Sequence, residues 1–233
     1  MRYTASITRS ATALAVASGF ALLQQDAKAI QFNISSIPGS EIRFTGSGTL
    51  AALSFSAGNN FQIDSVVGGA NTAAGYEGSF SGSWTMGPVT TVTLIPLVET
   101  APVSGTGTMT ISDGTDTLTA TVAWVVATSL KTIISVATLG VTGNVTGVSY
   151  SGSDPDLLAY AAGLNQTAVL SFTFPPPGKS LAQLVAPGSN GTTFSGNLVA
   201  EDNTVVPDSG TTLILLGLGL CGLAAVNPRF RKA

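Results

Sequence analysis

The run Gly107–Ser112 (GTMTIS) and the run at residues 117–126 (TLTATVAWVV), joined by Asp113-Gly114-Thr115-Asp116, decide the fold. In the second run apolar and small polar residues alternate, and the apolar set is Leu118, Ala120, Val122, Trp124 and Val126. Side chains of a strand point alternately to opposite faces, so this period of two predicts a half-buried strand. An Asp-Gly dipeptide between two alternating runs predicts that they pair as an antiparallel hairpin.

The same alternation recurs along most of the chain. Turn-forming clusters such as Ala57-Gly58-Asn59-Asn60 separate the runs. The other predicted strands are residues 30–34, 41–45, 49–55, 61–67, 77–86, 89–98, 132–139, 145–150, 168–174 and 193–200. Many short strands without alternating helices predict an all-β fold, a single antiparallel β-sandwich or jelly-roll-like domain.

One short helix interrupts the strands. In residues 154–163, Asp154 suits the helix N-cap, Pro155 the first helical position, and Gly163 a left-handed stop. Further on, Pro175-Pro176-Pro177 should end the preceding strand and run as polyproline.

The amino end has the pattern of a secretory signal peptide. Arg2 and Arg9 precede an apolar run at residues 11–23, and Ala27-Lys28-Ala29 follows. A basic segment, an apolar segment of roughly 7–15 residues and small residues at the −3 and −1 positions are what the export signal requires. We therefore expect export by the Sec machinery and cleavage after Ala29, an amphipathic or buried first helix being the alternative.

The carboxyl end carries a second apolar run, at residues 213–226, followed by a basic cluster of Arg229, Arg231 and Lys232. Extended over residues 209–212, the run would span about 27 Å as a helix, enough for a thin bilayer. Because Lys and Arg resist translocation, we expect a transmembrane helix with a cytoplasmic tail. A terminal helix packed into the core is the alternative.

Immediately before this run stands Val206-Pro207-Asp208-Ser209-Gly210. With the apolar run and the basic terminus, this tail resembles the VPDSG variant of the PEP-CTERM sorting signal. The resemblance implies that an exosortase, an integral-membrane enzyme, recognises the tail and cleaves near the motif. It also implies a bacterium that makes extracellular polysaccharide, with the mature protein at the cell surface or in an extracellular matrix or biofilm.

The composition excludes several functions. Between Ile30 and Asp208 the chain carries eleven acidic and three basic residues, a net charge of minus eight, so we exclude nucleic acid as a partner. The chain has no histidine, and its one cysteine, Cys221, lies in the tail run. A Ser-His-Asp triad, a histidine-ligated zinc ion and a disulfide framework are therefore excluded.

Two pairs of aspartates, Asp113 with Asp116 and Asp154 with Asp156, could offer oxygen ligands to Ca²⁺. Turn and cap chemistry explains the same residues without a metal, since Asp-Gly hairpins and Asp-Pro helix starts need them. We therefore expect no cofactor, with Ca²⁺ as the alternative.

A binding module is the second reading of the body, because sugars stack on exposed aromatic rings. Trp84, set among Ser81, Gly82, Ser83 and Thr85, is the expected glycan contact, whereas Trp124 lies on the apolar face of its strand. Glycoside hydrolysis by two carboxylates is a remote third reading, because no pair can be identified among the acidic residues.

The resulting division of the chain is a signal peptide (1–29), an all-β extracytoplasmic domain (30–200), a linker (201–205) and a sorting signal (206–233). The expected protein is not an enzyme. It is an exported structural protein, first anchored in the inner membrane and then processed by an exosortase. Extracellular polysaccharide is a further expected partner.

Overall fold

The structure is a computed structural model that describes residues 29–92, 97–131, 136–175 and 178–201, all within one compact unit. The described strands are β1 (Ile30–Ser36), β2 (Ile42–Gly46), β3 (Ala51–Phe55), β4 (Phe61–Val67), β5 (Glu77–Gly82), β6 (Trp84–Met86), β7 (Thr90–Val92), β8 (Leu97–Ser104), β9 (Gly107–Ser112), β10 (Thr117–Lys131), β11 (Val136–Ser149), β12 (Leu164–Phe172), β13 (Gly188–Thr192) and β14 (Phe194–Glu201). The described helices are α2 (Pro155–Ala162) and α3 (Leu181–Val185).

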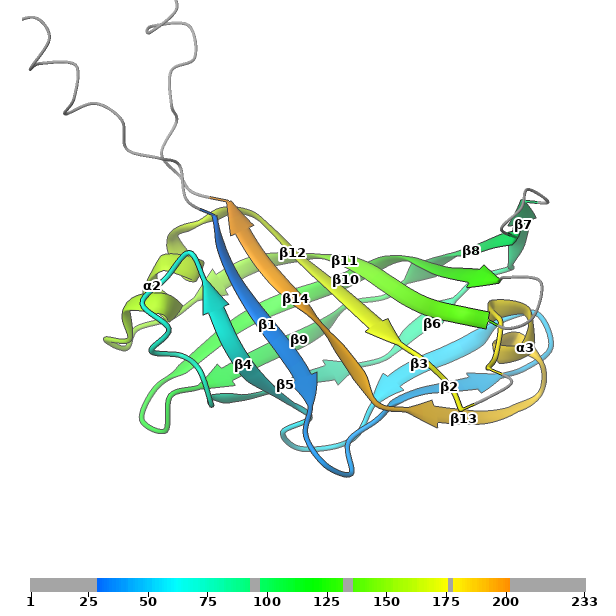
Figure 1. Cartoon of the computed structure of the whole chain (residues 1–233), viewed down its shortest axis with the longest axis horizontal. Coiled ribbons are helices and arrows are strands. Elements are labelled where there is room, and N and C mark those ends of the chain that lie inside the picture. The colour runs from blue at the N-terminus through cyan, green and yellow to red at the C-terminus, as the bar shows by residue number, and fades with distance from the viewer. Residues whose placement is uncertain (1–28, 93–96, 132–135, 176–177, 202–233) are drawn as a thin grey trace, which may run out of the picture. The chain divides into compact units, whose positions relative to one another are not determined.

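Within these residues, eight strands close into a barrel whose neighbouring pairs are all antiparallel (Figure 1). The order is β11-β12-β14-β1-β4-β5-β9-β10, and β10 pairs again with β11. The all-β class is confirmed, but the predicted sandwich or jelly roll is wrong. Two strands of 15 and 14 residues, β10 and β11, pair along nearly their whole length and close one curved sheet instead of facing a second.

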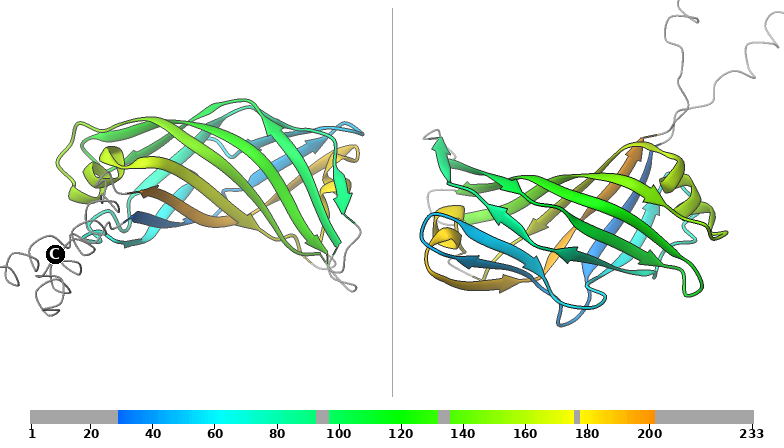
Figure 2. Two further views of the ribbon diagram at one scale, coloured as in Figure 1. Left: turned by 90° about the horizontal axis from the view of Figure 1, so that it is seen from above. Right: turned by 180° about the vertical axis from the view of Figure 1, so that it is seen from behind.

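A second group of strands branches from the barrel at β8. The amino-terminal part of β8 pairs with β10, whereas Val103 and Ser104 pair with β6. From β6 the order continues through β3 and β2 to β13 (Figure 2). The predicted strand at residues 77–86 is therefore two strands, and the one at 89–98 is part of a hairpin in which β7 pairs with β8. β13 and α3 were not predicted.

One buried apolar core spans the barrel and the branch. Within it, Trp84 meets Trp124 edge-on at 6.3 Å, and the partly buried ring of Phe55 packs against it, 5.8 Å from Trp84 and 5.3 Å from Phe194. Such contacts contribute about 0.5–1.5 kcal/mol each beyond area burial. A Cβ at Gly107 would lie 2.2 Å from Trp84, so a bare backbone is required beside this indole.

Strand β10, which contains the alternating run at residues 117–126, changes its pattern of buried positions part of the way along the strand. Leu118, Ala120, Val122 and Trp124 are buried as predicted. The register with β11 then shifts between Trp124 and Val126, and the buried positions become Ala127 and Ser129. A bulge of this kind bends a strand and increases its twist. Val126, predicted on the buried face, is consequently only partly buried.

Helix α2 confirms the predicted helix. The Asp154 carboxylate accepts hydrogen bonds from the amides of Asp156 and Leu157, and Pro155 stands in the first turn. The expected left-handed stop is wrong, because Gly163 has φ −71° and ψ 166° and leads directly into β12.

No helix in the described part of the chain is both long and apolar enough to cross a bilayer. The predicted signal peptide, linker and transmembrane segment lie outside the described residues, apart from Ala29 and Glu201.

The buried tyrosine of α2 provides a test of this core. Tyr160 stacks on Phe32 at 5.0 Å, and its hydroxyl has no hydrogen-bond partner among the described residues. We expect Tyr160→Phe to raise the free energy of unfolding by about 1 kcal/mol, because it removes a desolvated hydroxyl. Urea unfolding of the body measures this.

Tyr76→Phe is the matched control. Its hydroxyl donates to Asp154, so the same deletion should lower stability by about 1 kcal/mol. Destabilisation of similar size in both variants would show that Tyr160 Oη has a partner.

Candidate functional site

The aspartates singled out from the sequence meet at the end of the barrel that carries α2. The hairpin carboxylate Asp113 accepts hydrogen bonds from the amides of Thr115 and Asp116, at 2.8 and 2.6 Å. Its other oxygen accepts from the hydroxyl of Tyr150. The predicted hairpin between β9 and β10 is confirmed, and Asp113 has the turn role that its sequence context indicated.

Two tyrosines link this hairpin to α2. The hydroxyl of Tyr150 accepts from the Asp154 amide at 3.1 Å, and the hydroxyl of Tyr76 donates to Asp154 Oδ2 at 3.1 Å. Partial burial, followed by the hydrogen bond to Asp154, raises the pKa of Tyr76. Partial burial, followed by the hydrogen bond to Asp113, likewise raises the pKa of Tyr150. Both hydroxyls therefore stay protonated at neutral pH and act as donors.

The remaining aspartate holds the connection between β4 and β5. Asp156 is 1% exposed, and its carboxylate accepts from the amides of Ala70, Thr72 and Ala73 at 2.6–3.1 Å, and from the Thr72 hydroxyl. Backbone donors thus compensate the cost of burying this carboxylate. α2 is attached to the barrel through its own first turn.

This arrangement fits the turn-and-cap reading of the aspartates better than the calcium reading. Asp113, Asp154 and Asp156 already accept from several N–H or O–H groups, and a cation would have to displace those donors. In the described residues no three His, Cys, Asp or Glu side chains form a metal-binding group. The sequence did not show that Tyr76 and Tyr150 would connect the two aspartate pairs.

The expected glycan contact is not on the surface. Trp84 is 1% exposed and packs against Phe55 and Trp124, and its indole nitrogen lies 3.4 Å from the carbonyl of Val122. The expectation of an exposed indole is therefore wrong. Trp84 and Met86 point inward while Ser83 and Thr85 are exposed, so the period-two rule outweighs the polar neighbours.

A second feature lies at the other end of the body, next to α3. The carboxylate of Glu99, on β8 and 4% exposed, accepts from Ser129 Oγ at 3.0 Å and from the amide of Ala182 at 3.4 Å. These contacts fix the start of α3. The helix begins with a capping box between Ser180 and Gln183.

A hollow of about 810 Å³ lies beside α3. It is lined by Pro175, Gly178 and Lys179 from the segment after β12, and by residues 188–191 of β13. We call this hollow the β13 groove. Its size is in the range of ligand and peptide sites.

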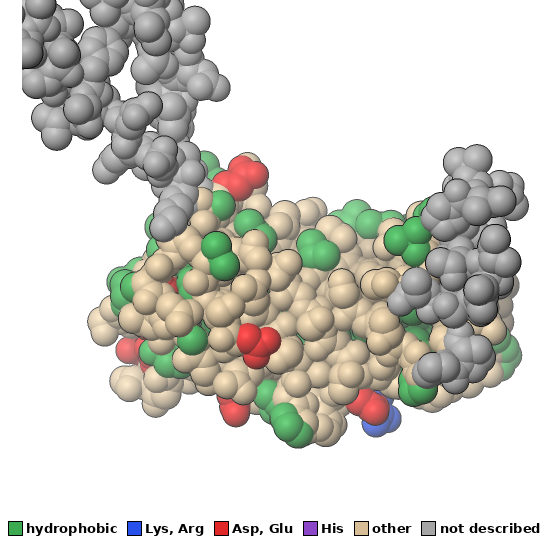
Figure 3. Space-filling model, viewed as in Figure 1, with side chains coloured by type: hydrophobic (Ala, Val, Ile, Leu, Met, Phe, Trp, Pro, Cys, Tyr) green, Lys and Arg blue, Asp and Glu red, His purple; other side chains and the backbone are tan. Residues whose placement is uncertain are grey.

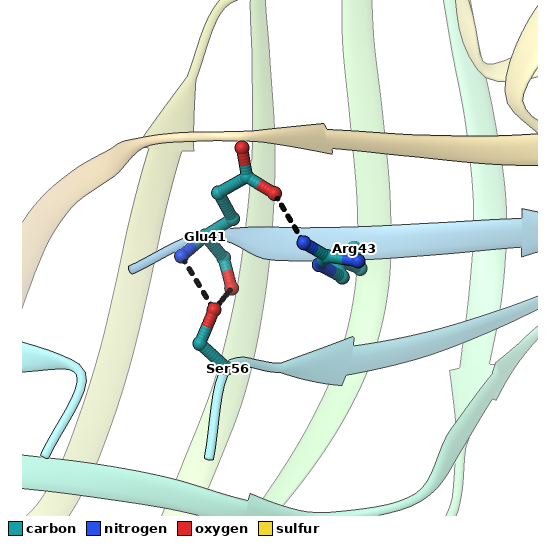
Figure 4. A network of polar contacts seen from close by, with 3 residues as sticks. All are labelled: Glu41, Arg43 and Ser56. Atoms are coloured by element: carbon teal, nitrogen blue, oxygen red, sulfur yellow. Dashed lines mark hydrogen bonds and ion pairs between the residues drawn. The ribbon is translucent and has the colours of Figure 1, made fainter. Parts of the chain in front are cut away.

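The polar surface near the β13 groove holds an ion pair. Glu41, the residue before β2, pairs with Arg43 of β2 at 3.0 Å, and its backbone is bound to Ser56 (Figure 4). Arg43 is in register with Gly191 of β13, where a Cβ would lie 2.3 Å from the Glu41 carboxylate. Only a glycine at position 191 leaves room for the Glu41–Arg43 ion pair beside β13. Elsewhere the visible surface is mostly uncharged (Figure 3).

The fold thus defines an all-β barrel protein whose identified polar clusters brace its two ends. The comparisons with known proteins give information on the carboxyl-terminal tail. The family model of the VPDSG-CTERM motif matches residues 205–230, so the chain carries a PEP-CTERM-like sorting domain, as its sequence indicated. No curated protein and no solved structure matched the chain. The five motif residues and the basic cluster lie outside the described part of the structure.

The tyrosine–aspartate contact predicts a pH effect. The hydrogen bond from Tyr150, followed by those from the Asp116 and Thr115 amides, lowers the pKa of Asp113. A carboxyl with a lowered folded-state pKa stabilises the fold above its unfolded value of about 3.9, and this stabilisation is lost as the pH falls through the folded-state pKa. Asp113→Asn should therefore lower Tm at pH 7 and reduce the fall in Tm between pH 5 and pH 2.

Thermal unfolding followed by circular dichroism across this pH range measures the effect. Asp64→Asn is the control, because Asp64 lies on β4 and the hydrogen bond that it accepts from Ser35 is exposed. Identical pH profiles for Asp113→Asn and the unaltered protein would contradict the assignment.

Proposed function

We propose that the chain is an exported envelope or extracellular-matrix protein of a bacterium. Its sorting tail is processed by an exosortase after Sec export, and its body is a non-catalytic structural module that needs no cofactor. The sorting motif at residues 205–230 supports export and processing directly. The structural role of the body rests on the arrangement described next.

The observation that carries this proposal is that the two ends of the body, where the terminal segments join it, lie next to each other. Ile30, the first residue of β1, pairs with Ala200, near the end of β14, so the chain begins and leaves the barrel at adjacent points (Figure 1). Cleavage after Ala29 and near the motif would remove no strand of the barrel. A closed barrel also leaves no unpaired edge around its ring.

The polar clusters of the body support a structural role. Asp113, Asp154 and Asp156 hold turns and a helix start, and Glu99 holds α3. Each carboxylate is already used in the fold and none faces the β13 groove. Glycan adhesion, the alternative function, loses its expected contact because Trp84 is buried.

Mass spectrometry of the mature protein's two ends tests the proposal. In cells with the exosortase, the surface protein should begin at Ile30 and lack residues 213–233. In cells without the exosortase, the full tail should be retained in the membrane fraction.

Pro207→Ala with Asp208→Ala should have the same effect as loss of the enzyme, while Asp202→Ala, outside the motif, serves as the control. A surface-localised mature form that still contains residues 213–233 would contradict the proposal.

A further inference from the structure

One edge of strand β13 has no partner strand among the described residues. Within the described residues, β13 ends the strand order and pairs with β2 alone. None of its five residues is charged or proline, although charges and prolines are the usual means of protecting such an edge. Its backbone donors and acceptors on that side are open to another strand.

The reason for this open edge lies in β12. Strand β14 pairs with β1 on one side and with β12 on the other. β13 directly precedes β14 in the chain, so a longer β12 could have paired with β13 as well. β12 ends at Phe172, so it does not continue beside β13. Pro175 follows, and a proline has no N–H to donate to a ladder. Among the described residues, Thr192 of β13 makes the one hydrogen bond to this stretch, donating from Oγ1 to the Thr173 carbonyl at 2.5 Å.

The β13 groove lies between β13 and the segment that follows β12, and it contains a basic side chain. Lys179 is half-buried there and has no carboxylate within ion-pair distance among the described residues. The Glu41 carboxylate, which lies beside Gly191 of β13, is already paired with Arg43. In a body with a net negative charge, this groove therefore favours an acidic extended segment.

We propose that the β13 groove binds residues 202–206 of a second copy of the chain by strand addition, so that processed copies associate head to tail. The segment reads Asp-Asn-Thr-Val-Val, and it has the same length as β13. Its β-branched residues favour a strand, and Asp202 supplies the negative charge for Lys179. Pro207 ends the pairing after five residues.

The same copy cannot place residues 202–206 in its own groove. β14 runs away from β13 over eight residues, which is about 26 Å at the usual rise per residue. Residues 202–206, fully extended, span at most about 18 Å, which is less than the length of β14. The partner must therefore be another copy.

Such a contact joins two different surfaces and does not close on itself, so it generates linear assemblies. The inference deepens the proposed function, on which it rests for the processed tail, by giving a matrix protein a means of self-association. Main-chain hydrogen bonds provide the affinity in this mode of recognition, and the groove provides the selectivity.

Binding of a synthetic peptide of residues 201–210 to the body, residues 30–201, tests the inference by fluorescence anisotropy. The body is used as one piece because the contacts of the chain group residues 28–203 into one compact unit. The peptide should bind saturably, and Lys179→Glu in the body should weaken binding by at least about fivefold at low salt. In sedimentation velocity, residues 30–210 should form oligomers and residues 30–201 should not.

The matched control leaves the body unaltered. A Val205→Pro peptide keeps the charge but loses a donor of the added strand, and it should not bind. No binding of the original peptide would overturn the inference, as would equal binding of both peptides or retention of an acidic polysaccharide instead of the peptide. Export and processing would be unaffected by such a failure, and a failure of processing would leave peptide binding unchanged.

Discussion

The pairing of β10 with β11 is the constraint on which the rest of the structure depends. These two long strands close the ring, and the bulge after Trp124 turns β10 so that both halves present buried side chains to one core. Closure of the ring brings the inward-facing side chains of the strands together, and the aromatic residues of β3, β5, β6 and β14 pack there. Gly143, whose Cβ would lie 2.7 Å from Trp124, lets β11 approach the indole.

Different polar contacts hold the helices and loops at the two ends of the barrel. At the α2 end, aspartates and tyrosines join a hairpin, a helix and the loop before β5. At the α3 end, the buried Glu99 positions a short helix, and the strand beside it keeps an open edge. One end therefore carries the attachment of the sorting tail and the other an accessible groove, which is the polarity that a linear assembly needs.

The sequence predicted what local patterns determine. Residues 61–67 and Gly107–Ser112 were predicted to the residue, and Asp154 with Pro155 marked the start of α2, because period-two alternation and cap chemistry act over a few residues. Closure of the barrel depends on pairings far apart in the chain, such as Ile30 with Ala200, which no local pattern shows. β13 was missed because Gly-Ser-Asn-Gly-Thr has no apolar alternation, and Trp84 was misplaced because its polar neighbours face outward.

The central claim is that residues 30–201 fold as a complete closed barrel with both tryptophans inside. Thermal unfolding of this body alone, followed by tryptophan fluorescence, tests it most directly. The account predicts one cooperative transition, blue-shifted emission before it, and a Tm within about 2 °C of the longer form that ends at residue 210. Red-shifted emission at low temperature, or a broad transition that sharpens only when the terminal segments are present, would contradict it.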